Sequence, residues 1–210
     1  EKINDSKILN DRSKHLESLY PPHKQVHGSY RAGMMFQHYA IENYNNTTLP
    51  LTHRTNNVMG VEKSINDNSL NITAENNTAV FAHPKDSIKA AIIKMVNMST
   101  IVKGGNKEFG DTPSVEELLT KFNPKDKTLY LNALKNSNLF AEDIVNFQDK
   151  NQMAAIIKFM MKVKMGNTTK PGEKSTFNTF YPKDNLMIDI YINEGVTEAF
   201  NTYAGSIGKN

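Results

Sequence analysis

The sequence predicts an α+β protein, mainly α, with a helical body, a small β-hairpin lobe and a cleft between them. Apolar residues recur at intervals of three and four over residues 32–40, 88–96 and 153–161, which is the spacing of one buried helix face. A shorter passage at residues 70–81 has two β-like arms around a polar turn. The 210 residues are enough to bury a sizeable core, and no internal repeat indicates a solenoid.

Composition excludes several classes of function. The formal net charge of +3 favours approach to an anionic surface but falls short of the basic stripe of a nucleic-acid binder. Without cysteine there is no disulfide framework and no thiolate metal site. His15, His23 and His27 have no further ligand at metal spacing, so we expect solvated histidines, no metal and no cofactor. No apolar run approaches the length of a membrane span.

The first residues are expected to form an N-terminal arm, residues 1–27. Scattered aliphatic residues in 1–20 are compatible with a short amphipathic helix, which Pro21 and Pro22 would end. Because the chain begins with Glu1 and not Met, we expect a processed product, an excised fragment or part of a longer protein.

A first helix of the body is predicted to end near Tyr44, with Glu42 at the edge of its apolar face. An Asn/Thr-rich loop follows at 45–50, and residues 56–61 form a turn in which asparagine tolerates left-handed backbone. An ordinary Asx-type turn would explain that segment equally well. The hairpin of residues 70–81 should carry Glu75 at or near its tip.

Further helices are predicted along the body. A helix start at 83–86 precedes the apolar stripe of 88–96, and a capping box at Ser114–Glu117 begins the next helix. That helix breaks at 122–126, a helix resumes at 129–134, and a Met-rich core stripe marks another at 153–161. The body is therefore expected to span residues 28–166.

A C-terminal extension is predicted over residues 167–210. Residues 168–172 are typical of a linker. Residues 177–181 and 186–192 have the character of a β-hairpin, and 195–205 of a short last helix.

Four stretches of the body follow one another in the order and spacing of a known family: residues 40–43, 56–63, 72–75 and 80–88. They resemble the bacterial N-acetylglucosaminidase family of autolysins and flagellar muramidases, in the lysozyme-like superfamily. That family has a helix ending in Ala-x-Glu-Ser, an Asn-Asn-x-Phe-Gly-Ile-Lys turn, a Thr-Thr-Glu hairpin and a Phe-Arg-x-Tyr-x-Ser helix entry.

Related phage virion-associated domains are similar as well. They carry an Asn-Asn-Pro-Gly-Asn-Ile turn and then Phe-x-x-Pro-x-Asp-Gly-Ile-Arg-Ala, comparable with residues 81–90 here. The resemblance covers residues 30–165. It implies a lysozyme-like fold and a peptidoglycan hydrolase that cuts glycosidic bonds of the cell-wall glycan. It also implies a virion-associated or secreted protein that acts at the bacterial wall on glycan strands, with other virion proteins as further partners.

The resemblance also implies the site residues. Glu42 would be the general acid, kept protonated by apolar neighbours such as Tyr44. Glu75 would be the second, ionised carboxylate, and Glu62 is the alternative for that role. Tyr44 and Glu62 would also lie on the substrate-binding side of the site. Asn57 would shape the floor of the cleft. Tyr130 matches the family's cleft tyrosine, although by itself it would be interpreted as a core residue.

An alternative function stays open: a catalytically inactive structural virion protein that uses the lysozyme-like fold for assembly or wall binding. Asn43 stands where the family has Ser after the glutamate, Met59 replaces the turn's aromatic residue, and the chain has no Trp. These departures favour the structural alternative, whereas the retention of Glu42 and Glu75 favours the enzyme.

Overall fold

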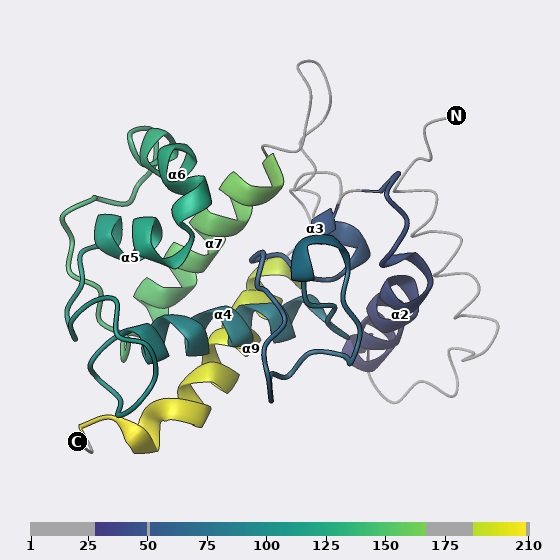
Figure 1. Ribbon diagram of the computed structural model, residues 1–210, viewed down its shortest axis with the longest axis horizontal. Helices are drawn as coiled ribbons and strands as arrows, with labels where there is room; N and C mark the ends of the chain where they lie inside the picture. Colours follow the sequence, from purple (N-terminus) through teal and green to yellow (C-terminus); the bar gives the residue numbers. More distant parts are fainter. Residues whose placement is uncertain (1–27, 50, 167–186, 209–210) are drawn as a thin grey trace. The chain divides into compact units, whose positions relative to one another are not determined.

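The computed structural model describes residues 28–49, 51–166 and 187–208, and this part of the chain is mainly helical (Figure 1). The α-helices are α2 (Gly28–Asn43), α3 (Leu51–Arg54), α4 (Pro84–Met98), α5 (Val115–Phe122), α6 (Lys127–Leu134), α7 (Lys150–Gly166) and α9 (Met187–Tyr203). The described residues also include the 3-10 turns η2 (Glu75–Asn77), η3 (Pro124–Asp126) and η4 (Ala204–Ser206). The predicted arm 1–27, the linker 168–172 and the β-like segment 177–181 lie outside the described residues.

The chain divides into two compact units. Unit 1 comprises residues 1–87 and 165–187, and unit 2 comprises residues 88–164 and 188–210. The division falls inside α4. The domain of residues 28–166 stays a prediction.

Unit 1 is built on α2, which confirms the helix predicted to end near Tyr44. Phe36, Tyr39 and Ala40 are buried at offsets of three and four, as the apolar pattern requires. At the C-terminal end, the Asn43 side-chain amide donates to the Tyr39 carbonyl at 3.0 Å, one turn back along the helix.

The segment 61–81 of unit 1 pairs through isolated antiparallel bridges and, in the described residues, forms no sheet. Thr73 bridges to Ala79 and Glu62 bridges to Thr78. Between the arms, η2 turns the chain, and the Ala74 amide donates to the Thr78 carbonyl at 2.9 Å. Asn76 and Asn77 adopt positive φ, which asparagine tolerates better than most residues. Glu75 lies in this turn.

Unit 2 packs α5, α6 and α7 with the greater part of α4 and with α9. Its core is aliphatic and Met-rich and includes Ile92, Met95, Leu118, Leu119, Met153, Ile156, Ile157, Met160 and Met161. The predicted N-cap of α5 is confirmed, because the Ser114 hydroxyl accepts from the Glu117 amide at 3.1 Å. Helices α5 and α6 contact each other, and the Tyr130 ring of α6 lies 6.4 Å from the Phe159 ring of α7.

The predicted β-type segment at residues 186–192 is wrong from Met187 onward, because this stretch begins α9. Tyr191, Ile192, Val196, Ala199 and Tyr203 are all buried, at the spacing of one helix face. A short apolar run is ambiguous between strand and helix, and here the buried face that continues from Tyr191 to Tyr203 is that of a helix. The predicted last helix over residues 195–205 is the second half of α9 followed by η4.

Within the described residues, no helix combines the length and apolar character that crossing a membrane requires.

Candidate functional site

Arg54 at the end of α3 is the centre of the polar structure in unit 1. The residue is only 2% exposed. Its Nε donates to the Leu49 carbonyl at 3.1 Å and its Nη1 to the Tyr44 carbonyl at 2.6 Å. Its Nη2 forms a hydrogen-bonded ion pair with the Glu75 carboxylate. One guanidinium group therefore connects the end of α2, the 45–50 loop and the η2 turn.

Glu75 is an ionised carboxylate in this arrangement. The hydrogen bond from Arg54 lowers the pKa of Glu75 below its ordinary value, against a smaller opposing effect of burial. The Glu75 side chain is 43% exposed, so the carboxylate is tied to a buried cation yet remains open to solvent. This combination suits an anion that stabilises positive charge or activates water.

Glu42 lies in the last turn of α2 and is exposed. The apolar surroundings expected for a general acid are therefore not formed around its carboxyl group in the protein alone. Tyr44 is half-buried, two residues beyond Glu42, and its carbonyl accepts the bond from Arg54. Glu42 and Glu75 thus belong to segments that Arg54 holds together.

Asn57 is buried and fully engaged with backbone groups. Its Nδ2 donates to the carbonyls of Val61 (2.7 Å) and Ala79 (2.9 Å), and its Oδ1 accepts from the Val61 amide at 2.9 Å. These contacts stabilise the 57–61 turn and attach it to the returning arm of the η2 turn. The Asn57 side chain therefore stabilises the backbone conformation of unit 1.

Asn56 has the same kind of role with more distant partners. At φ 54° it is left-handed, and its Nδ2 donates to the carbonyls of Phe36 and Phe81, each at 2.9 Å. Arg54 joins the chain just after α2 to the η2 turn, Asn56 joins α2 to Phe81, and Asn57 joins the 57–61 turn to Ala79. We call Arg54, Asn56 and Asn57 the 54–57 clamp.

His83 is a neutral residue of the unit 1 interior. Burial, with a smaller contribution from the charge of Lys85, lowers the pKa of His83 to about 4. Its Nδ1 accepts from the Lys85 amide at 3.0 Å, and its ring meets Phe36 edge-on at 5.1 Å. A proton acceptor with this pKa is uncharged at neutral pH.

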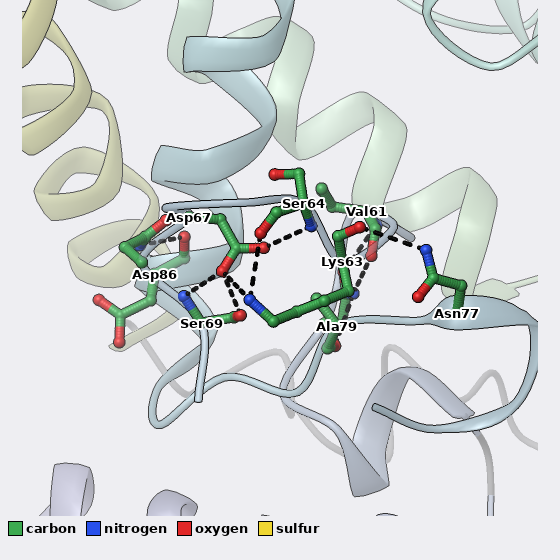
Figure 2. A network of polar contacts seen from close by, with 10 residues as sticks. Val61, Lys63, Ser64, Asp67, Ser69, Asn77, Ala79 and Asp86 are labelled. Atoms are coloured by element: carbon green, nitrogen blue, oxygen red, sulfur yellow. Dashed lines mark hydrogen bonds and ion pairs between the residues drawn. The ribbon is translucent and has the colours of Figure 1, made fainter. Parts of the chain in front are cut away.

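The loop that follows Glu62 is organised around Asp67, as Figure 2 shows. The Asp67 carboxylate accepts from the Lys63 ammonium (2.8 Å), the amides of Ser64 (2.9 Å) and Ser69 (3.0 Å), and the Ser69 hydroxyl. Burial alone would raise the pKa of Asp67, but these donors outweigh it and lower the pKa to about 2. Glu62 itself is exposed beside this loop.

Tyr130 lies in unit 2 and is 1% exposed. Burial, aided by the charge of Asp126, raises the pKa of its hydroxyl above the ordinary value. This environment is that of a core tyrosine. The residue would be interpreted in the same way from the sequence without the family resemblance.

Sequence reasoning missed Arg54 and Asp67. Arg54 ends the short helix α3, belongs to no motif, and is distinguished only by its burial. Lys63 and Asp67 are four residues apart, a spacing that has meaning in a helix but predicts nothing in a loop. In the described part of the chain, no group of three or more His, Asp or Glu residues is arranged to hold a metal ion.

Comparison with known proteins adds no relative: no protein-family model matches the chain, and no curated protein matches it.

Proposed function

We propose that the chain is a peptidoglycan hydrolase with a lysozyme-like fold and a β-hairpin lobe around Glu75, cleaving glycosidic bonds of the cell-wall glycan. The observation that carries the proposal is the connection of two candidate carboxylates through one buried residue. Arg54 binds the Tyr44 carbonyl, two residues beyond Glu42, and also binds the Glu75 carboxylate. Glycosidases use such a pair of carboxyl groups, one protonated and one ionised.

The chemistry requires different environments for the two carboxyl groups, and the protein alone supplies that of Glu75. Glu75 is kept ionised by Arg54 and is the group that stabilises the oxocarbenium-like transition state or activates water. Glu42 is the general acid. A glycan strand lying over the exposed end of α2 displaces water from the Glu42 carboxyl group, and desolvation raises its pKa.

In this proposal Tyr44, Asn57 and Glu62 serve the substrate side of the site. Tyr44 is a half-buried residue just after α2, and Asn57 fixes the 57–61 turn. Glu62, exposed beside the Asp67 loop, is available to sugar hydroxyls. The protein acts at the bacterial wall, as a virion-associated or secreted component.

A second candidate function is a wall-binding or assembly protein of the virion that cleaves nothing. The exposure of Glu42 favours it, because a solvated carboxyl group is a poor acid at neutral pH. The ion pair of Glu75 favours it as well, since neutralising a buried arginine is a sufficient structural role.

Release of soluble muropeptides from purified peptidoglycan separates the two functions. The wild type is compared with Glu42→Gln, which keeps the shape and removes the acid, and with Glu142→Gln, a charge-matched control at an exposed position of unit 2. We expect release by the wild type and the control and a loss of at least about 10²-fold in Glu42→Gln. No release by folded wild type, over several cell walls and pH values, would refute the enzyme. Co-sedimentation with the same walls then tests the binding protein.

A further inference from the structure

Arg54 is a buried cation whose contacts all join parts of the proposed site. Its three nitrogen atoms reach the Leu49 carbonyl, the Tyr44 carbonyl and the Glu75 carboxylate. Because the guanidinium group is planar and rigid, these bonds fix the orientation of Glu75 relative to the end of α2. A flexible ammonium group would fix position far less well.

The charge of Arg54 is balanced by Glu75. Carbonyl oxygens satisfy hydrogen bonds but carry no net charge, and among the described residues the ion pair of Arg54 is made with Glu75. A cation that is 2% exposed requires such a counter-charge. The same contact that places Glu75 therefore also favours its ionised form.

We propose that Arg54 is a positioning residue that fixes the Glu75 carboxylate against the end of α2 and commits it to the anionic role, leaving the acid role to Glu42. This inference rests on the proposed hydrolase function for its catalytic consequence. Its physical content, the coupling of Arg54 to Glu75, exists whether or not the protein cleaves glycan.

Two substitutions separate position from charge. Arg54→Lys keeps the positive charge but cannot donate to all three acceptors in the plane that they define, whereas Arg54→Gln removes the charge as well. Lys103→Gln, at an exposed loop position of unit 2, is the charge-matched control. Each variant is measured by muropeptide release as a function of pH and by NMR titration of the Glu75 carboxyl carbon.

The expected results differ between the variants. In Arg54→Gln the Glu75 titration should move to higher pH, and the acidic limb of the pH–rate profile should move with it. In Arg54→Lys that limb should stay near its wild-type position while kcat falls by about 10- to 100-fold and KM changes little, because misplacement alone is costly. The Lys103→Gln control should resemble the wild type in both measurements.

An unchanged Glu75 titration in Arg54→Gln would overturn the inference. If that variant does not fold, the wild type provides the test: the Arg54 Nε–H resonance should shift with the same midpoint as the Glu75 carboxyl carbon, and independent titration of the two would overturn it. A wild type that releases no muropeptides refutes the hydrolase function, and the Glu75 titration still decides the role of Arg54.

Discussion

Replacing Asn57 with Ala should be among the most destabilising substitutions in unit 1. The truncation removes the three hydrogen bonds of the Asn57 side chain. The Val61 carbonyl keeps the bond that it accepts from the Ala79 amide at 3.1 Å. The Val61 amide and the Ala79 carbonyl, both in buried residues, lose the Asn57 partner.

A buried polar group left without its partner costs about 1–3 kcal/mol. Two such groups give an expected loss of roughly 4 kcal/mol in the free energy of unfolding. Asn68→Ala is the matched control, because Asn68 makes one side-chain hydrogen bond, to the Asp86 carbonyl at 2.9 Å, on the exposed surface. Its loss should stay below about 1 kcal/mol.

Urea unfolding followed by circular dichroism measures both losses, and amide hydrogen exchange at Val61 reports the local effect. We expect the Val61 amide to lose protection in Asn57→Ala and to keep it in Asn68→Ala. Equal losses of stability in the two variants, with Val61 still protected, would refute the reasoning from buried partners.

Three further predictions concern single contacts. Asp67→Asn should destabilise the protein at pH 7 by an amount on the order of 2 kcal/mol, because folding lowers the pKa of Asp67 from 3.8 to about 2. That stability is present above the unfolded-state pKa and is lost as the pH falls through about 2, so thermal unfolding of variant and wild type should converge there. Gly105→Ala should lower the melting temperature more than Gly104→Ala: both glycines have positive φ, but a Cβ at Gly105 would lie 2.6 Å from the Asn97 carbonyl oxygen. Ser114→Ala should cost about 1 kcal/mol in urea unfolding, because it removes the cap of α5.

The helices of the body were predictable because their burial follows local periodicity. The stripes at 32–40, 88–96 and 153–161 became α2, α4 and α7, and each signal is contained in one short window of sequence. The N-cap at Ser114 is local in the same sense. The prediction at residues 186–192 was wrong because these seven residues alone resemble a strand. The buried face of α9 becomes recognisable only when the sequence is followed to Tyr203.

The partners of Arg54 were not predictable for the opposite reason. Glu75 is 21 residues away in sequence, and no periodicity connects the two. The local sequence also does not predict that the arginine at the end of α3 is buried. Asp67 is similar: its donors are nearby in sequence, but they converge only because the loop adopts a conformation with Asn66 at φ 60°.

The contacts of the 54–57 clamp determine which substitutions can distinguish the two proposed functions. An Asx-type turn would have kept the bonds of Asn56 and Asn57 local, but these side chains reach Phe36, Ala79 and Phe81, 20 to 25 residues away. These contacts connect the parts of unit 1 whether or not the protein cleaves glycan.

The same holds for Glu75, whose charge balances Arg54 in either case. Loss of activity on changing Glu75 would therefore be ambiguous between chemistry and folding. Glu42 differs from Glu75 in that it is an exposed residue in the last turn of α2. Urea unfolding of Glu42→Gln beside the wild type separates the two causes: a loss of hydrolysis with unchanged stability would report on the acid itself.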